Sequence, residues 1–163
     1  MIEFQNLQPM HWAFVKSIYE EGIKSGNATF QQQAPEWDTW DLDHLKHSRI
    51  IALENNEVVG WAALSPVSGR CVYAGVAEVS VYVAAQQRGN KIGHSLLEEL
   101  VKQSEANSIW TLQAGIFPEN MASLKIHEAN GFRIVGFREK IGQMNGRWRD
   151  TIYLERRSNI VGV

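Results

Sequence analysis

Apolar residues recur along the chain with two periods, and these periods predict where its helices and strands lie. Apolar residues three and four positions apart predict a helix, and strict alternation predicts a strand. The first pattern predicts helices over residues 10–24, 38–46, 92–106 and 120–129, with Asp38 or Thr39 capping the second. The second predicts strands over residues 2–7, 49–54, 58–65, 72–83, 109–117, 132–141 and 148–156.

The order of these elements predicts an α/β fold in which helices pack on one mixed sheet. Turn residues separate the strands where the backbone must reverse. Asn55–Glu57 and Asn145-Gly146 are each expected to close a hairpin. No linker or repeat interrupts the chain, which predicts one domain over residues 1–157 and a frayed tail over residues 158–163.

The stretch Val76–Leu100 joins a strand, a polar loop that contains glycine, and a helix. The first N–H groups of a helix and the positive end of its dipole attract anions, so such a loop is suited to phosphate groups. Many α/β folds share this pattern, which alone is weakly specific. The chain has no GxGxxG and no GxxxxGK[ST] motif, and this disfavours a Rossmann site and a P-loop NTPase.

Charge and composition narrow the function classes. The 163 residues carry a formal net charge of −2, so no nucleic-acid partner and no membrane partner is expected. The single cysteine, Cys71, cannot form an internal disulfide. No apolar run reaches the roughly 20 residues of a transmembrane helix and no signal peptide is recognisable, so a cytoplasmic protein is expected. His44 and His47 lack further ligands nearby, so no metal is expected.

Two separated motifs resemble those of a known family. Residues 88–93, RGNKIG, are similar to the Arg/Gln-x-x-Gly-x-Gly/Ala loop of the GCN5-related N-acetyltransferases (GNAT). Residues 120–132, NMASLKIHEANGF, resemble the family's helix Asn-x-x-Ala/Ser-x-x-x-Tyr/His-x-x-x-Gly-Phe. The resemblance implies a mixed, mostly antiparallel central sheet that is splayed at the coenzyme site and flanked by helices. It also implies transfer of an acetyl group from acetyl-CoA to an amine.

A closer resemblance is to the phosphinothricin and methionine sulfoximine acetyltransferases. Four segments carry it: Ala28–Phe30, Arg70–Tyr73, Glu78–Val83 and Gly146–Asp150. The phosphate loop departs from the family, because Lys91 stands where the first glycine is usual. A positive φ at Lys91 would add strain of about 1 kcal/mol, whereas a helical φ would be harmless and would bring charge near the phosphates.

The resemblance implies that the central strand, the loop and the later helix bind acetyl-CoA. Unpaired N–H groups of Val81 and Val83 are expected to contact the pantetheine or the thioester carbonyl. Asn120 is expected to cap its helix, to contact the pantetheine, or to do both. The expected coenzyme-binding residues are Val81, Tyr82, Val83, Arg88, Gly89, Asn90, Lys91, Gly93, His94, Asn120 and Ser123.

Glu78 and His127 are the candidate catalytic residues. Glu78 stands among apolar residues on a strand expected at the sheet centre, where burial would suit a carboxylate to act as a general base, directly or through water. The alternative is an acid paired with a surface cation. His127 occupies the position of a tyrosine that is thought to protonate the CoA thiolate in many GNAT members. It could act as that acid, act as a second base, or be a hydrogen-bonded histidine of a helix face.

Phe30, Arg70 and Tyr73 are the candidates for binding the acceptor. The Arg70 guanidinium can bind a substrate carboxylate at two points, or it can remain a solvated loop charge. Phe30 and Tyr73 could form the walls of a pocket for a small amino acid, or they could pack in the core. Related enzymes pair, so a homodimer is expected.

The residues together with the resemblance predict an acetyl-CoA-dependent N-acetyltransferase that acts on a small amino acid or analogue. Phosphinothricin and methionine sulfoximine are implied by the resemblance alone. Two alternatives stay open. One is acetylation of a peptide N-terminus or another amine, which would need a more open groove. The other is a non-catalytic sensor that binds acyl-CoA, which would not need Glu78 or His127.

Overall fold

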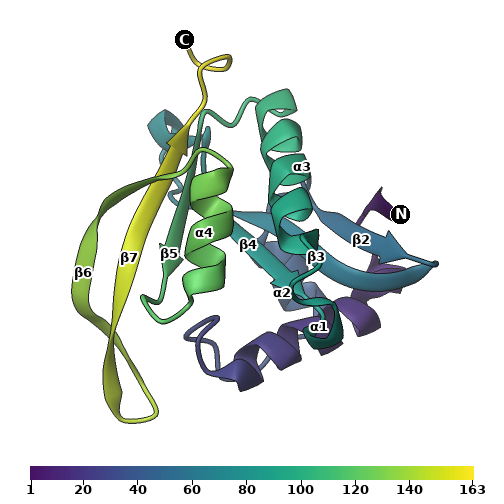
Figure 1. Ribbon diagram of the computed structural model, residues 1–163. Helices are drawn as coiled ribbons and strands as arrows, with labels where there is room; N and C mark the ends of the chain where they lie inside the picture. Colours follow the sequence, from purple (N-terminus) through teal and green to yellow (C-terminus); the bar gives the residue numbers. More distant parts are fainter.

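The computed structural model describes residues 1–163 and contains one seven-stranded sheet with four α-helices (Figure 1). The strands are β1 (Ile2–Asn6), β2 (Ile50–Glu54), β3 (Glu57–Pro66), β4 (Val76–Val83), β5 (Thr111–Ile116), β6 (Arg133–Met144) and β7 (Arg147–Arg157). The helices are α1 (Trp12–Ser25), α2 (Trp37–Asp43), α3 (Ile92–Ala106) and α4 (Met121–Ala129). Three short 3-10 segments are η1 (Pro9–His11), η2 (Cys71–Tyr73) and η3 (Ala85–Gln87).

The strands lie in the order β1-β2-β3-β4-β5-β7-β6, which places β4 at the centre of the sheet. Every neighbouring pair is antiparallel except β4 and β5, which run parallel. The predicted mixed, mostly antiparallel sheet is therefore confirmed.

Strands β4 and β5 pair only at their beginnings. Val76, Ala77 and Glu78 lie opposite Thr111, Leu112 and Gln113, and no later pair is formed. Both strands continue beyond this point, and Figure 1 shows them diverging on either side of α4. The sheet is therefore splayed at its centre, as expected.

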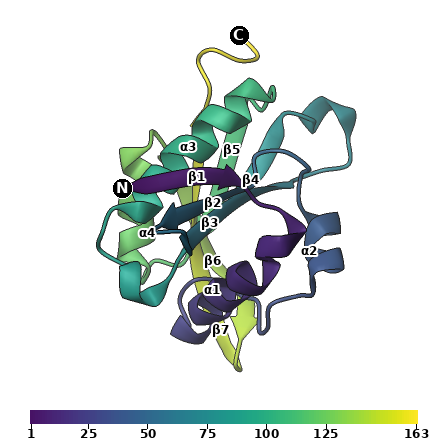
Figure 2. The same ribbon diagram turned by 90° about the vertical axis from the view of Figure 1, so that its right-hand side faces the viewer.

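Helices cover both faces of the sheet, and the two-residue period of the strands divides the core between them. Ile50 and Leu64 point to the face under α3, where they join a cluster that includes Leu96 and Leu100. Ile51 and Trp61 point to the opposite face, against α1 and α2. Figure 2 shows α1 and α2 on the side of the sheet away from α3.

Both predicted hairpins form, and their turn residues explain why. Asn55 and Asn56 have φ values of 51° and 64°, and Asn145 and Gly146 have values of 51° and 75°. Two successive residues with positive φ give the turn whose twist matches that of paired strands, and Asn and Gly adopt it at low cost.

Two predicted element boundaries are wrong. Residues 72–75 do not extend β4, because η2 occupies residues 71–73 and the strand begins at Val76. The second helix begins after Glu36, not after Asp38 or Thr39, and it ends at Asp43. Here the packing of Trp40 between Trp12 and Trp61 determines the position of the helix more than the capping residues do.

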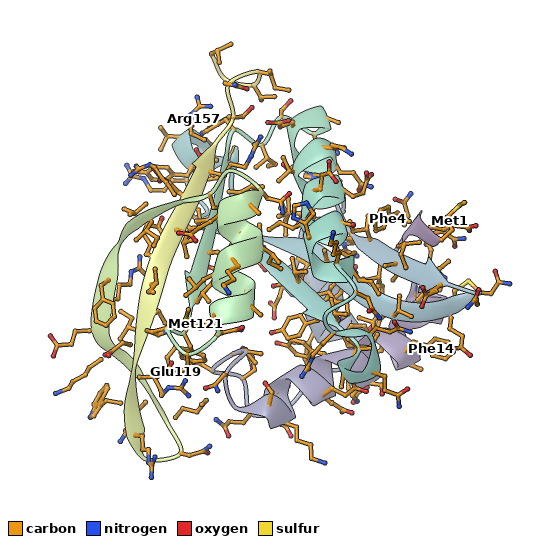
Figure 3. The ribbon with its side chains drawn as sticks, viewed as in Figure 1. Met1, Phe4, Phe14, Glu119, Met121 and Arg157 are labelled. Carbon is orange, nitrogen blue, oxygen red and sulfur yellow. The ribbon has the colours of Figure 1, made fainter.

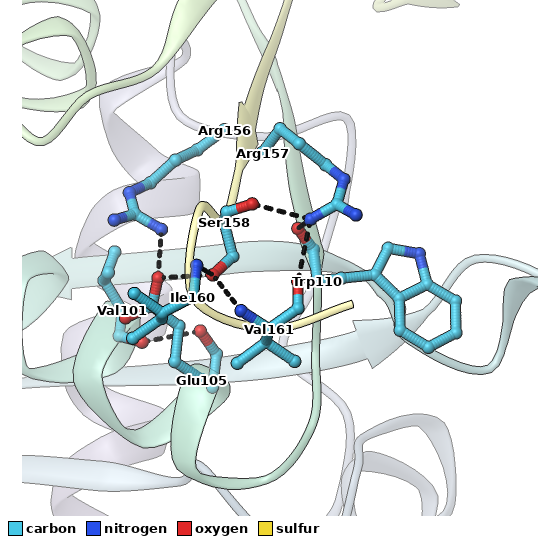
Figure 4. Close-up of polar contacts among 9 residues, drawn as sticks. Val101, Glu105, Trp110, Arg156, Arg157, Ser158, Ile160 and Val161 are labelled. Carbon is cyan, nitrogen blue, oxygen red and sulfur yellow. Dashed lines mark hydrogen bonds and ion pairs between the residues drawn. The ribbon is translucent and has the colours of Figure 1, made fainter. Parts of the chain in front are cut away.

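The predicted fraying of the tail after Arg157 is also wrong. Figure 4 shows that the Arg157 side chain donates hydrogen bonds to carbonyl groups of the tail. The backbone N–H of Ser158 donates to the Trp110 carbonyl at 2.8 Å, and its hydroxyl donates to Glu105 at 2.9 Å.

None of the chain's helices is both long enough and apolar enough to cross a bilayer.

Candidate active site

A cavity of about 640 Å³ lies where β4 and β5 separate. The loop after α1 (residues 28–33), the second half of β4, the end of β5, α4 and the β6–β7 hairpin form its walls. Five segments distant in sequence therefore meet at the splayed point of the sheet.

Glu78 lies at the wall of this cavity, at the last position of β4 that is paired with β5. The expected burial of Glu78 is wrong, because the residue is exposed where the sheet opens. Its alternative role as a partner of a surface cation is not seen either. The hydrogen-bond partner of its Oε2 is the neutral amide Nε2 of Gln113, at 3.5 Å. The carboxylate is thus free to contact a molecule in the cavity.

His127 is 4% exposed and lines the same cavity from α4. Its Nδ1 lies 2.7 Å from the carbonyl oxygen of Ser123. A carbonyl only accepts, so Nδ1 carries the hydrogen and Nε2 carries a lone pair. Nε2 is buried without a partner. Burial lowers the pKa of His127, so the neutral form dominates at pH 7.

This protonation state bears on both expected roles of His127. A general acid would need a proton on Nε2, and the neutral Nδ1–H tautomer has none there. A base or hydrogen-bond acceptor is compatible with it. The ring also packs against Phe132 at 5.0 Å between centroids, so its packing and its hydrogen-bonding capacity coexist.

Asn120 begins α4, as predicted. Its side-chain Oδ1 accepts a hydrogen bond from the backbone N–H of Ser123 at 3.2 Å, which makes it the N-cap. Its Nδ2 donates to the carbonyl of Asn27 at 3.1 Å. Asn120 therefore joins the start of α4 to the loop after α1, and both Asn120 and Ser123 line the cavity.

Arg149 on β7 contacts both the loop after α1 and the segment before α4. Its guanidinium donates to the carbonyl of Gly26 at 3.0 Å and to Asn27 Oδ1 at 2.8 Å, and it pairs with Glu119 at 3.3 Å. It also lies over the ring of Phe117, 4.0 Å from the centroid. Figure 3 shows Glu119 and Met121 at the start of α4, beside the loop after α1.

The loop Arg88–Gly93 leads directly into α3. Gly89 has a φ of 86°, and Lys91 is the N-cap of α3 in the left-handed conformation, with φ 63° and ψ 7°. Of the two conformations considered for Lys91, the lysine therefore adopts the one with positive φ, which is strained for a residue with a Cβ atom. The N–H groups of the first turn, including those of Gly93 and His94, have no partner within the helix. This arrangement suits an anion.

The loop also lies against α4. A Cβ atom on Gly93 would come within 3.2 Å of Ile126 Cδ1 and 3.5 Å of Val83 Cγ2, so glycine allows this close approach. The side chain of His94 faces α4 as well, and its Nδ1 accepts from Asn130 Nδ2 at 3.1 Å. The proposed phosphate loop and the cavity thus meet at the same helix.

The second half of β4 carries free N–H groups toward the gap. Ala84 N–H donates to Val59 on β3, and hydrogen-bonding direction alternates along a strand. The N–H groups of Val81 and Val83 therefore point away from β3, where β5 has already diverged. The Tyr82 side chain stacks on Trp61 at 4.8 Å, and burial raises its pKa well above the usual value.

The three expected acceptor residues do not lie together. Phe30 lines the cavity and packs edge-on against Phe117, with 4.8 Å between ring centroids. Arg70 and Tyr73 are exposed at η2, where the guanidinium lies 5.8 Å from the tyrosine ring. Neither lines the cavity within one chain.

The structure brings three residues to the site that the sequence did not indicate. They are Gln113 on β5, Tyr153 on β7 and Arg138 on β6. Alternation along the last hairpin could have indicated which residues share a face. However, the register of β6 shifts between Ile134 and Gly136 and again between Arg138 and Gly142. No cluster of three metal-ligating side chains is present.

Comparisons with known proteins bear on the family and the fold. The sequence profile of the Acetyltransferase (GNAT) family matches residues 12–132. An L-methionine sulfoximine/L-methionine sulfone acetyltransferase of Pseudomonas paraeruginosa is 35% identical over 102 residues, which are 61% of this chain and 58% of that protein. A phosphinothricin N-acetyltransferase of Streptomyces coelicolor is 36% identical over 103 residues, which are 63% of this chain and 60% of that protein.

The match thus spans about three fifths of the length of these curated relatives. One solved structure has a similar fold over nearly the whole length of this chain. The GNAT superfamily phosphinothricin acetyltransferase of Sinorhizobium meliloti, in complex with acetyl-CoA, is 26% identical with a TM-score of 0.88. The alignment covers 99% of this chain and 90% of that chain, which confirms the expected fold.

The left-handed conformation of Lys91 predicts a gain from glycine. Lys91→Gly should raise the free energy of unfolding by about 1 kcal/mol, because a Cβ atom is unfavourable at φ 63°. Urea unfolding followed by circular dichroism measures this change. Arg88→Gly, at a φ of −64°, is the matched control and should show no gain. An unfolding free energy of Lys91→Gly at or below the wild-type value would contradict the strain.

The lowered pKa of His127 predicts a dependence of stability on pH. The unfolded chain takes up this proton first as the pH falls, so its contribution to stability is lost below pH ~6.5. His127→Gln should therefore flatten the fall in unfolding free energy between about pH 7 and 5.5. His44 and His47 have lowered pKa values too, so the difference between wild type and variant is the readout. Identical slopes would contradict the prediction.

Proposed function

The chain belongs to the acetyltransferase (GNAT) family, and we propose that it moves the acetyl group of acetyl-CoA to the amine of a small amino acid or analogue. Phosphinothricin and methionine sulfoximine are the acceptor types that the names of its relatives suggest. The observation that carries the proposal is the cavity at the splay. It combines unpaired strand amides with a carboxylate, beside a helix start suited to phosphates.

The residues around the splay fit acetyl-CoA. The N–H groups at the start of α3 would bind the diphosphate, and Arg88 and Lys91 would add positive charge. The outward N–H groups of Val81 and Val83 would pair with the pantetheine arm as an added strand does. Asn120 and Ser123 would contact the same arm from α4.

Glu78 would act as the general base. An amine attacks a thioester only as the neutral form, so its ammonium must lose a proton to the carboxylate, directly or through a water molecule. The nitrogen then forms a bond to the carbonyl carbon, and the oxyanion is stabilised by strand N–H groups. The C–S bond breaks, the CoA thiolate leaves, and it takes up a proton released by the attacking nitrogen.

His127 would support this proton transfer as an acceptor. Its Nε2 lone pair is available in the neutral tautomer, so it could orient the amine or a relay water. Arg70 and Tyr73 lie outside the cavity of one chain, and their proposed contacts with the acceptor require another arrangement of this segment or of a neighbouring chain.

The β6–β7 hairpin supports the proposal of a homodimer. Large apolar side chains are exposed along it: Ile134, Val135, Phe137, Ile141 and Trp148. Light scattering should give the mass of two chains for the wild type, and Trp148→Glu should shift it toward one. Met10→Glu, at an exposed apolar residue on η1, should leave it unchanged. A wild-type mass of one chain would contradict the dimer.

A turnover screen tests the reaction and its base. Thiol release from acetyl-CoA is measured with free amino acids, sulfoximines, phosphinates and peptides as acceptors. Glu78→Gln should lower kcat by roughly 100-fold or more and leave the Kd for acetyl-CoA unchanged. Glu139→Gln, an exposed acid of β6 outside the cavity, is the control. Binding of acetyl-CoA without turnover of any amine would favour a sensor, and peptides as the best acceptors would favour N-terminal acetylation.

A further inference from the structure

We propose that Arg138 binds the anionic group of the acceptor and that a row of side chains across four strands sets it opposite Glu78. This inference rests on the proposed acetyltransferase activity and concerns the identity of its acceptor. None of the relatives' names assigns a role to this arginine, and the sequence pattern gave no reason to select it.

The charges of the cavity point to such a pairing. Arg138 is the one lysine or arginine among the lining residues, and Glu78 is the one carboxylate. His127 is held neutral by burial. The side chain of Arg138 forms no ion pair and no hydrogen bond with the rest of the chain, although seven other cations on the structure pair with acids. An unpaired guanidinium at a cavity wall is suited to a carboxylate or phosphinate.

The position of Arg138 is fixed by Tyr153. The guanidinium carbon lies 4.4 Å from the centroid of the Tyr153 ring, a distance at which a cation is attracted to the ring face. Tyr153 lies on β7 and Arg138 on the edge strand β6, so this contact keeps the exposed arginine beside the cavity that it lines. The ring thereby orients the guanidinium without neutralising it.

The same tyrosine is connected to Glu78 through Gln113. The Tyr153 hydroxyl donates to Gln113 Oε1 at 2.7 Å. This bond orients the amide so that its Nε2 faces Glu78 Oε2, at 3.5 Å, and Gln113 is also the register partner of Glu78. The reverse amide orientation would place two oxygens against each other. Glu78, Gln113, Tyr153 and Arg138 thus form one row across β4, β5, β7 and β6.

The row has a consequence for acceptor choice. It presents a carboxylate at one end and a guanidinium at the other, separated by two neutral side chains. An acceptor that carries an ammonium and an anion in one small molecule complements the charges of both ends. A peptide N-terminus has no carboxylate beside its amine, so it would leave Arg138 unpaired unless a side chain supplied the anion. The row therefore favours free amino acids and their analogues over peptides.

The test compares Arg138→Gln with wild type on matched acceptors. Methionine sulfoximine and its carboxamide differ in the carboxylate, and phosphinothricin and its α-carboxamide differ in the carboxylate but share the phosphinate. We expect the KM for methionine sulfoximine to rise about tenfold or more, because a charge-assisted bond is lost. The KM for its carboxamide should stay within about twofold. Arg138→Lys should recover part of the loss.

The comparison of phosphinothricin with its α-carboxamide shows which anionic group of the acceptor Arg138 binds. A rise in KM for phosphinothricin that persists with its α-carboxamide, while methionine sulfoximine is unaffected, would assign Arg138 to the side-chain phosphinate. Equal changes for charged and uncharged acceptors would overturn the proposal. Arg147→Gln removes an exposed arginine of the same hairpin outside the cavity and is the control. Thermal unfolding of each variant checks that the fold persists.

Tyr153→Phe separates the contact of Tyr153 with Arg138 from its hydrogen bond to Gln113. It keeps the ring beneath Arg138 and removes only the hydroxyl that orients Gln113. We expect kcat to fall several-fold while the KM ratio between methionine sulfoximine and its carboxamide stays unchanged. An unchanged kcat, or loss of that ratio, would contradict the positioning role of the hydroxyl.

Calorimetry in the presence of CoA measures the Kd of each of these acceptors and so tests the role of Arg138 without turnover. If the wild type binds them without acetyl transfer, the proposed function fails, and the Kd values of Arg138→Gln still decide the role of the arginine. If the wild type binds no acceptor of either kind, the role proposed for Arg138 fails as well.

Discussion

Strands β4 and β5 are hydrogen-bonded over only three residue pairs, and the candidate site depends on the gap that follows. In Figure 1, α4 lies in front of the gap between the diverging strands. His127 packs there against Phe132, and Ile126 approaches Gly93 at the start of α3. Because β5 has diverged from β4 beyond Glu78, the outward N–H groups of the second half of β4 have no strand partner on that side. A continuous sheet would satisfy the same groups and leave no cavity.

The gap also explains how backbone N–H groups of β4 are left without a strand partner at little cost in stability. A buried N–H without a partner destabilises a protein, but Val81 lines an open cavity where water or a ligand can accept its hydrogen bond. The positive φ of Lys91, by contrast, is a local cost near the same site. Both features lie beside the start of α3, where strain and free donors favour ligand binding over stability.

The parts of the structure that the sequence predicted depend on local signals. Asn-Asn and Asn-Gly turns specified the hairpins, and helical spacing together with Asn120 specified α4. The exposure of Glu78 could not be predicted this way, because its apolar neighbours on β4 gave no sign that β5 would diverge. The position of Arg138 at the cavity could not be predicted either, because two register shifts in β6 break the alternation that assigns residues to a face.

This difference follows from how the two halves of the site are assembled. The proposed coenzyme half comes mainly from one continuous stretch, residues 76–94, whose order of strand, loop and helix is visible in a single sequence. The proposed acceptor half combines the loop after α1, the end of β5 and the last hairpin. These segments meet only in the folded chain, where Arg149 joins β7 to that loop and Arg138 packs on Tyr153. If the proposal holds, acceptor specificity can change through the hairpin while the proposed coenzyme-binding stretch remains the same.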